Sequence, residues 1–526
     1  MKGSCTKALT WLVVLSMVLL LLPVSSLAEA SGAEKYPEHL KIRFFYRDKA
    51  MGQPNMVEDD AVKAYLEDKF NITIDYTLVP SPNQSEVFEK LNLLIASNDI
   101  PDVMHTVTGY GLGREIYQAL AENEQLVNIG QKVVEDPARW PLMHQRMQSE
   151  GLMGYMNPSD GEYYCLPVSN NPWDHVLLIR QDWLDKLGLA MPTTVFELRD
   201  VLEKFVAEDP DGQKNVGLTA PSTWFLLHII TAFTGTWGYY DDGEKLVSEW
   251  LHPGQKEGVA FLADMMQSGL IDKDIFTHQQ YQDEIAKFVS GRAGVLLFHM
   301  GAISREREMR ETFPDARVSL VPLDLSGPGG NTLFTGLPWY EATSIWSGCK
   351  DPDRVLDLLE FLLSEEGIDL YENGVEGIHY TIAEDGERIK NLEALEHDNW
   401  GYPRAYSGRH WWTWQMVRLD SLPDKDAMLE GDVTEEVADA YIAGFEQLLQ
   451  MVRDGEVAMN PIEGLPVDAW EIVGSRPSDV TNTYYAEFLI GEKNVEEHWD
   501  KMIEEYRAAG YDLVEAEVNE KYYQGH

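Results

Sequence analysis

The stretch KIRFFY at residues 41–46, with ITIDYTLV at 72–79 and DVMHTV at 102–107, sets the fold class. Each segment is rich in the β-branched, aromatic and other apolar residues that are typical of strands. Between them, residues 58–70 and 85–97 carry apolar side chains at helical spacing. Strand, helix, strand, helix and strand in this order predict a parallel α/β sheet covered by helices on both faces.

Polar residues lie at the ends of these predicted strands. Arg47 directly follows the first strand, and His105 and Thr106 close the third. Ligands of parallel α/β sheets bind beyond the carboxyl ends of the strands. We therefore expect these side chains to lie near a ligand.

A second α/β unit is predicted after residue 161. HVLLIR (175–180) is typical of a strand, and QDWLDKLGL (181–189) of a short helix. Thr194 and Glu197 have the spacing of a capping box and predict the start of the next helix. Further predicted elements are a buried strand within 291–300, a helix that begins after Asp351, and helices at 434–453 and 495–508.

The first thirty residues have the layout of a secretory signal peptide. Lys2 and Lys7 precede an apolar run over 11–22, and small residues end in Ala28-Glu29-Ala30. The run is shorter than the roughly 20 residues that cross a bilayer. No cysteine directly follows the run, so the sequence predicts a mature protein without a lipid anchor, in the periplasm or secreted.

Composition excludes several classes of protein. The chain has 42 Lys and Arg against 88 Asp and Glu, a formal net charge of −46. Such a charge repels nucleic acid and anionic membrane surfaces. Cys165 and Cys349 remain after the signal peptide, too few for a disulfide scaffold or a zinc site, and whether they pair stays open. The length predicts two or more domains.

Several segments spread along the chain resemble one protein family. They are LNLLIASNDIPDV (91–103), IRQDWLDKLGLAMPTTVFELRDVLEKF (179–205), FVSGRAGVLLFH (288–299), EEGIDLYENGVEGIHYT (365–381) and HWDKMIEEYRAAGYDLVEAEVNEKYY (498–523). In combination they are similar to the extracellular solute-binding proteins of ABC importers, family 1, in the long-chain, carbohydrate-binding branch.

The resemblance implies a two-lobed periplasmic-binding-protein-like α/β fold with a ligand cleft between the lobes. The chain of such a fold crosses between lobes at three hinge segments, which we expect near 166–175, 292–298 and 338–348. The expected N-terminal lobe comprises 38–165 with 298–340, and the C-terminal lobe 170–292 with 346–526.

The resemblance also implies a function. The mature chain would capture an oligosaccharide, close around it and deliver it to an ABC permease. No catalysis, no cofactor and no nucleic-acid partner are implied, and a monomer is expected.

Clustered tryptophans support a sugar ligand. Aromatic rings suit the apolar faces of sugar rings, while carboxylates, amides, Arg and His suit the hydroxyl edges. The aromatic candidates are Trp173, Trp237, Trp339, Tyr340, Trp411 and Trp412, and the polar ones are Arg47, Asn171, Glu341, Arg409 and His410. Core packing is the alternative for every tryptophan, and it is the expected role of Trp183, Trp224, Trp250, Trp470 and Trp499.

One segment departs from the family. AEDPDGQKNVGL (207–218) stands where many members carry a calcium loop of the form DPDGNGxxD. Asp209 and Asp211 match the first two ligands and Gln213 replaces an Asn, but Lys214 stands at the second Gly and the later Asp is missing. Because too few oxygen ligands remain, we expect no calcium here. The alternative is an ordinary Asp-Pro-Asp-Gly turn.

Other functions remain open at this stage. A secreted glycoside hydrolase needs two carboxylates at a defined separation, and 87 acidic residues outside the signal peptide allow many such pairs. The sequence contains no GxSxG, HExxH or P-loop motif. A peptide-binding protein of the same fold, or an adhesion or sensing module, also fits the sequence.

Overall fold

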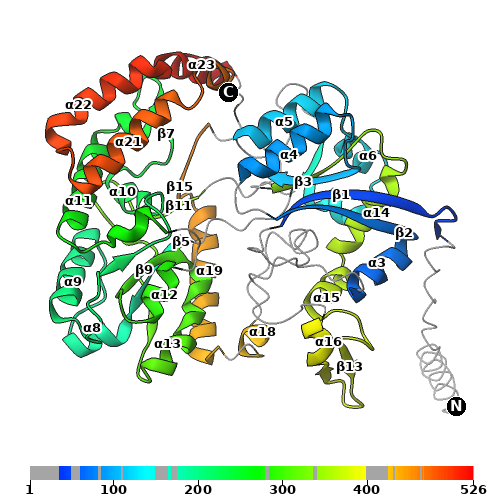
Figure 1. Ribbon diagram of the computed structural model, residues 1–526, viewed down its shortest axis with the longest axis horizontal. Helices are drawn as coiled ribbons and strands as arrows, with labels where there is room; N and C mark the ends of the chain where they lie inside the picture. The colour runs from blue at the N-terminus through cyan, green and yellow to red at the C-terminus, as the bar shows by residue number, and fades with distance from the viewer. Residues whose placement is uncertain are drawn as a thin grey trace, which may run out of the picture.

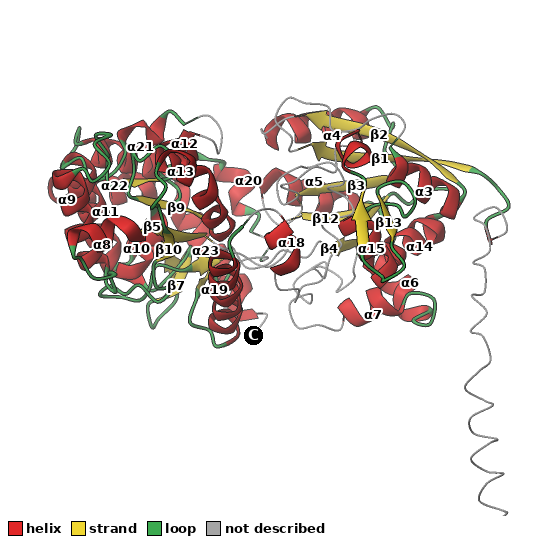
Figure 2. Ribbon diagram, turned by 90° about the horizontal axis from the view of Figure 1, so that it is seen from below, coloured by secondary structure: helices red, strands yellow, loops and turns green. Residues whose placement is uncertain are grey.

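The protein is described from a computed structural model, in which two sheets lie in two lobes (Figure 1). The structure describes residues 35–48, 60–80, 84–107, 111–147, 164–167, 175–278, 283–335, 341–397, 425–430, 433–462, 465 and 467–524. Both views place the helices of residues 61–135 and 352–363 (α3 to α6 and α14) in one lobe, and those of residues 181–267 and 476–506 (α8 to α11, α21 and α22) in the other (Figure 1, Figure 2).

The first sheet has the strand order β2-β1-β3-β12-β4. Its strands are β1 (Leu40–Asp48), β2 (Ile72–Pro80), β3 (Val103–Val107), β4 (Cys165–Pro167) and β12 (Glu341–Ile345). β1 pairs in parallel with β2 and with β3, as predicted. β12 runs antiparallel to both β3 and β4, so the complete sheet is mixed.

Apolar cores cover both faces of this sheet. This confirms the prediction, made from strands that alternate with helices in the sequence, of a sheet covered on both faces. Ile42 and Phe44 pack in a core on one face, and Phe45 and Met104 pack in a separate core on the other. The helices of this lobe are α3 (Ala61–Phe70), α4 (Gln84–Ala96), α5 (Gly111–Glu122), α6 (Ile129–Glu135), α7 (Pro141–Met147), α14 (Pro352–Leu363), α15 (Glu365–Asn373) and α16 (Leu392–His397). A hairpin of β13 (Tyr380–Ile382) and β14 (Arg388–Lys390) completes it.

The second sheet has the order β10-β5-β9-β6. Its strands are β5 (His175–Arg180), β6 (Leu218–Thr219), β9 (Val295–His299) and β10 (Val318–Leu320). Every residue of β5 is buried, including His175 and Arg180 at its ends. One large core surrounds the sheet and extends to Met502 near the end of the chain.

The helices of the second lobe come from two parts of the chain. They are α8 (Gln181–Leu187), α9 (Val195–Glu208), α10 (Leu227–Thr234), α11 (Pro253–Gln267), α12 (Asp283–Val289), α13 (Glu306–Thr312), α18 (Lys425–Glu430), α19 (Glu435–Arg453), α20 (Ala469–Val473), α21 (Arg476–Ile490), α22 (Val495–Tyr506) and α23 (Asp512–Gln524). Two small sheets, of β7 (Tyr239–Asp241) with β8 (Leu246–Ser248) and of β11 (Phe334–Thr335) with β15 (Ala458–Met459), lie beside them.

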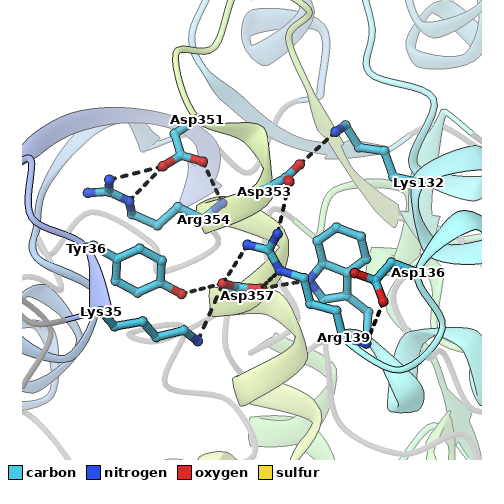
Figure 3. A network of polar contacts seen from close by, with 10 residues as sticks. Lys35, Tyr36, Lys132, Asp136, Arg139, Asp351, Asp353, Arg354 and Asp357 are labelled. Atoms are coloured by element: carbon cyan, nitrogen blue, oxygen red, sulfur yellow. Dashed lines mark hydrogen bonds and ion pairs between the residues drawn. The ribbon is translucent and has the colours of Figure 1, made fainter. Parts of the chain in front are cut away.

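A buried polar network fixes α14 within the first lobe (Figure 3). The carboxylate of Asp357 accepts two hydrogen bonds from Arg139, at 2.9 and 3.0 Å, and one from Trp140 Nε1 at 2.9 Å. The hydroxyl of Tyr36 also donates to Asp357. The network therefore joins the beginning of the described chain, the α6–α7 connection and α14, three segments far apart in sequence.

These sheets correct the predicted division into lobes. Residues 298–340 were assigned to the N-terminal lobe, but β10 pairs with β5 in the second sheet. Residues 346–526 were assigned to the C-terminal lobe, but Val355 and Leu358 of α14 pack in the first-lobe core. The chain therefore returns to the first lobe for 341–397 before it completes the second.

The predicted crossing at 292–298 is wrong. This segment contains β9, which pairs with β5 and with β6 inside the second sheet and is apolar because it is buried there. The chain instead changes sheets between Pro167 and His175, and again between Thr335 and Glu341. Part of the expected 338–348 crossing is thus strand β12 of the first sheet.

Two further features concern the cysteines and the membrane. Cys165 and Cys349 are both buried, free thiols, which answers the question of pairing that the sequence left open. Across the described residues, the longest apolar helices fall short of what a bilayer crossing requires.

Candidate functional site

The strand ends of the first sheet bring several candidate residues to one edge. Glu341, the first residue of β12, pairs with Val107 at the carboxyl end of β3. Arg47, the penultimate residue of β1, lies at the same edge, opposite Val79 of β2. The strand order and register therefore gather Arg47 and Glu341 at one end of the sheet, although their side chains lie outside the described residues.

His105 of β3 is buried beside this edge. Its Nδ1 lies 2.9 Å from the hydroxyl oxygen of Thr343 on the neighbouring strand β12. A histidine packed between two strands contributes to the sheet and is only 3% exposed. It is therefore a structural support of the edge in this conformation.

The other candidates of the joining segments lie outside the described residues. They are Asn171, Trp173, Trp339, Tyr340, Arg409, His410, Trp411 and Trp412. Their contacts with a ligand stay a prediction. Asn171 and Trp173 follow β4 in the sequence, and Trp339 and Tyr340 precede β12. These flanking strand ends lie at the same edge, because Pro167 pairs with Ala342.

The matching edge of the second sheet carries three histidines. His175 begins β5, and His299 ends β9 as its direct cross-strand partner. Their ring centroids lie 4.5 Å apart. His228 of α10 completes the group, with its Nε2 at 3.2 Å from His175 Nδ1 and its Nδ1 at 2.9 Å from the Thr332 carbonyl oxygen.

Burial disfavours the charged form of two of these rings, His175 and His228. It lowers the pKa of His175 well below the ordinary value, and the nearby His299 and His228 lower it further. Burial also lowers the pKa of His228 to about 3, although its hydrogen bond to Thr332 opposes the shift. His175 and His228 are therefore uncharged at neutral pH. The described residues include no group of three or more His, Cys, Asp or Glu arranged to hold a metal ion.

An aromatic stack continues from the histidines to the surface. The ring of Phe334 on β11 lies parallel to His228 at 3.7 Å on one side and to Trp237 at 3.8 Å on the other. Trp224 meets Phe334 edge-on at 5.6 Å and Trp237 at 6.0 Å. We call Trp224, His228, Trp237 and Phe334 the aromatic stack. Trp224 and Trp237 are half-buried, so the stack reaches the molecular surface.

Polar groups adjoin Trp237. Glu249 Oε2 accepts a hydrogen bond from the Gly238 backbone at 2.7 Å. Burial raises the pKa of Glu249 to about 7, against the lowering effect of that bond. A carboxyl group with such a pKa can donate as well as accept a hydrogen bond near neutral pH. Glu249, Gln255 and Trp237 line one narrow pocket with no space for a small molecule in this conformation.

The two edges are tethered close together. Six residue steps separate Thr335 of β11 from Glu341 of β12, so these residues are at most about 22 Å apart. Eight steps separate Pro167 of β4 from His175 of β5, which allows at most about 29 Å. A ligand of several rings could therefore contact the polar edge of the first sheet and the aromatic stack of the second.

The five tryptophans that the sequence analysis expects in the core differ in their burial. Trp183 and Trp499 are buried in the second-lobe core, as expected. Trp250 and Trp470 are half-buried and pack against core clusters. Trp224 was also expected in the core, and it does pack against it, but it belongs to the aromatic stack as well.

Sequence reasoning missed the three histidines and Phe334. His175 and His299 stand at the ends of the quoted segments HVLLIR and FVSGRAGVLLFH, and His228 ends STWFLLH. The sequence signal that could have identified the three histidines is their position at the ends of predicted strands and of a helix. Only the antiparallel register of β5 and β9 shows that they converge.

Comparison with known proteins identifies the family. The family model described as bacterial extracellular solute-binding protein matches residues 53–369. Lipoprotein LipO of Bacillus subtilis (strain 168) is 24% identical over 69% of this chain and 72% of its own length. The polygalacturonan/rhamnogalacturonan-binding protein YtcQ of the same organism is 21% identical over 89% of each chain.

A solved structure shows the same fold. The alginate-binding protein AlgQ2, crystallised without calcium ion, superimposes with a TM-score of 0.67 at 19% identity, over 92% of this chain and 98% of that one. The likeness covers both lobes, and it agrees with the mixed α/β, periplasmic-binding-protein-like fold that the sequence predicted. The family model spans more than half of the chain, and the chain therefore belongs to the bacterial extracellular solute-binding proteins.

Proposed function

We propose that the mature chain captures an oligosaccharide between the two sheet edges and delivers it to an ABC permease. Membership of a solute-binding family makes the chain a binding protein and not an enzyme. YtcQ is named for polygalacturonan and rhamnogalacturonan, and AlgQ2 for alginate, which supports a carbohydrate ligand. The aromatic stack at the end of the second sheet is the observation that carries the proposal.

The aromatic stack suits one face of a sugar ring. Sugar rings expose C–H groups on their faces, and a tryptophan offers a large, rigid apolar surface that is cheap to order. Trp237 is held on Phe334 at 3.8 Å with an angle of 10° between rings. A ring fixed in this way loses little further freedom when a ligand binds.

The first-sheet edge supplies the hydrogen-bonding groups. Arg47 and Glu341 lie at that edge, and Asn171, Trp173, Trp339 and Tyr340 adjoin its strands in sequence. Micromolar affinity requires about 8 kcal/mol. Several charge-assisted hydrogen bonds together with stacked rings can supply that amount.

Binding would close the two lobes. A ligand that contacts both edges stabilises the closed arrangement over the open one, so the population shifts toward closed. The predicted result is a smaller radius of gyration in solution scattering when a tight ligand is added. An unchanged radius with a bound ligand would contradict closure.

The proposal also includes location. Residues 1–30 would be removed as a signal peptide, leaving a protein in the periplasm or secreted, next to the permease. LipO is named a lipoprotein, whereas the first cysteine after the apolar N-terminal run of this chain is Cys165. The mass of the protein purified from a native envelope fraction would show either cleavage after Ala30 without lipid or an added acyl mass.

The ligand is tested with a panel of neutral and uronate oligosaccharides, with peptides as a second panel. A ligand that binds only the folded state raises the melting temperature. The expected result is a saturable rise with a saccharide and an intact saccharide afterwards. Cleaved saccharide would indicate a hydrolase, and a rise with peptides alone would indicate the peptide-binding alternative.

Two matched variants test the aromatic stack. Trp237→Leu removes a half-buried ring from the stack and is expected to weaken saccharide binding at least about tenfold, or 1.4 kcal/mol. Trp250→Leu is the control, because Trp250 is also half-buried in the second lobe but packs against Tyr485 and Trp499. Calorimetry should give the control an affinity within about twofold of wild type. Equal losses in both variants would remove the stack from the site.

A further inference from the structure

The loop after α9 resembles the calcium loop that many members of the family carry. Asp209 and Asp211 match its first two ligands, and Gln213 replaces an Asn. Calcium takes six to eight oxygen ligands. Whether an ion fits therefore depends on which oxygens of this loop are not already bound by the protein.

Asp209 is already saturated by the loop itself. Its Oδ2 accepts from the Lys214 backbone at 3.0 Å, and its Oδ1 accepts from the Asn215 backbone at 3.3 Å and from Asn215 Nδ2 at 3.1 Å. Both oxygens of this carboxylate are thus directed at protein donors.

Asp211 faces a buried arginine. Arg180, the last residue of β5, is fully buried, and its Nη1 lies 2.8 Å from Asp211 Oδ2. The contact is an ion pair without the alignment of a hydrogen bond. Asp182 binds the other side of the same guanidinium through two hydrogen bonds, at 2.8 and 2.6 Å.

Aromatic rings hold this guanidinium in place. Its central carbon lies 4.7 Å from the ring centroid of Trp183 and 5.3 Å from that of Phe313. A positive charge over aromatic faces is stabilised most when it is shielded from water. Arg180 is therefore a fixed cation, bound by two carboxylates and enclosed by two rings.

A second cation binds a loop carbonyl. Lys186 of α8 donates to the backbone oxygen of Pro210, between the two loop aspartates. The next carbonyl oxygen, that of Asp211, accepts from Gln213 Nε2 at 3.3 Å. The residues present do not fit a calcium ion, because the carboxylates and these two carbonyls already have donors or cations.

We propose that Arg180 and Lys186 provide, from within the polypeptide, the positive charge that a bound calcium ion provides in loops of this kind. The loop is then closed by covalently attached cations, which cannot dissociate or be removed by a chelator. The second lobe of this protein folds and binds its solute without calcium.

The first test is calcium titration of the mature protein. Melting is followed in EGTA and in excess calcium chloride, and the two melting temperatures are expected to agree within about 1 °C. If calcium bound to the folded protein, a free calcium concentration of 1,000 times the dissociation constant would add about 4 kcal/mol to the free energy of unfolding. This corresponds to a rise in melting temperature on the order of 10 °C. A saturable rise of that size, abolished in Asp209→Asn, would overturn the proposal.

The second test examines the attached cations directly. Lys186→Met removes the cation from the Pro210 carbonyl and is expected to lower the melting temperature by about 2–4 °C. Lys204→Met is the control, since Lys204 is an equally exposed lysine on α9 for which the described residues form no ion pair. Equal melting temperatures for the two variants would show that Lys186 does not support the loop.

Arg180→Lys completes the series. Lysine keeps the positive charge, but its ammonium group cannot make two parallel hydrogen bonds to Asp182 and contact Asp211 at the same time. The variant is expected to be less stable than Lys186→Met and still insensitive to calcium. If it does not fold, the calcium titration and the lysine pair decide the proposal without it.

Discussion

Asp357 in the first lobe and Glu284 in the second are both buried carboxyl groups, but their surroundings differ. Asp357 is bound by Arg139, Trp140 and Tyr36 (Figure 3). Glu284, on α12, is fully buried, and neither of its carboxylate oxygens has a hydrogen-bond partner in the described structure. The nearest basic group is His278, whose Nδ1 lies 3.9 Å from Glu284 Oε2.

The difference predicts opposite responses to pH. Burial alone would raise the pKa of Asp357, but the hydrogen bonds from Arg139 and Tyr36 lower it overall. The stability that Asp357 contributes is therefore complete at pH values above the ordinary pKa of an aspartate. It is lost as the pH falls through the lower pKa of Asp357 in the folded protein. Burial raises the pKa of Glu284 from 4.5 to about 7. Its contribution is complete below pH 4.5 and is lost as pH rises through 7.

The comparison teaches how each lobe uses polar groups. The first lobe is assembled from residues 35–167 and 341–397, which are separated in the sequence by residues 175–335 of the second lobe. The carboxylate of Asp357 accepts several hydrogen bonds and joins these two segments. The second lobe has one large apolar core, which encloses the buried carboxyl of Glu284 without donors. Two variants, each with a control and in order of expected effect, would sharpen or break this contrast.

Asp357→Ala should give the largest effect. The substitution leaves the guanidinium of Arg139 and the groups of Trp140 and Tyr36 without their acceptor. Breaking a buried pair by removing one partner costs about 3–5 kcal/mol. Urea unfolding should show this loss in the transition of the first lobe.

Asp353→Ala is the control for that variant. Asp353 also binds Arg139, at 3.1 Å, and lies on the same helix, but its side chain is 34% exposed. Exposed pairs contribute about 0–1 kcal/mol. If both variants lost the same stability, the buried network would not be what joins the segments of the first lobe.

Glu284→Gln should change the pH dependence of stability. Glutamine resembles the protonated carboxyl group, which the folded protein prefers up to about pH 7. The raised pKa costs the wild-type protein roughly 3 kcal/mol between pH 4.5 and 8, at about 1.4 kcal/mol per pKa unit. The variant should therefore be more stable than wild type at pH 8 and similar to it at pH 5.

Glu306→Gln separates this effect from the loss of any buried glutamate. Glu306 is also buried in the second lobe, but it binds the Val318 backbone and Arg310, each at 2.7 Å. Burial raises the pKa of Glu306 too, but the Val318 backbone and Arg310 oppose the shift. Its substitution loses these bonds, so any gain at pH 8 should be smaller than that of Glu284→Gln. An equal gain at pH 8 would mean that the missing donors around Glu284 do not cause the effect.

Local signals in the sequence predicted the elements well. The β5 strand occupies the predicted residues 175–180, and α9 begins after Thr194, whose hydroxyl accepts from Glu197 N at 3.1 Å. The reciprocal half of the capping box differs, because the Glu197 carboxylate binds the backbone and hydroxyl of Thr193. Caps and strands are set by neighbours in the sequence, so they can be predicted from it.

Long-range pairing could not be predicted in the same way. The local pattern within 291–300 predicts a buried strand, whereas the crossing at 292–298 came from the family resemblance, and β9 is a central strand of the second sheet. α14 belongs to the first lobe through Asp357 and its distant donors, which no local pattern shows. The same limit applies to the candidate site. Trp237 could be named as a candidate from its residue type, but its stacking on Phe334 joins residues that are distant in the sequence.

Gly188→Ala should give the smallest effect and measures a local turn without any buried charge. Gly188 ends α8 with a φ of +65°, and its N–H donates to the Asp185 carbonyl. No atom lies within 4 Å of an added Cβ, so only the left-handed backbone opposes alanine, at a cost of about 1 kcal/mol. Gly188→Asn should cost less, because asparagine tolerates this conformation. Urea midpoints of the two variants at equal slope would show the difference, and a larger loss for asparagine than for alanine would mean that packing, not backbone strain, decides the end of this helix.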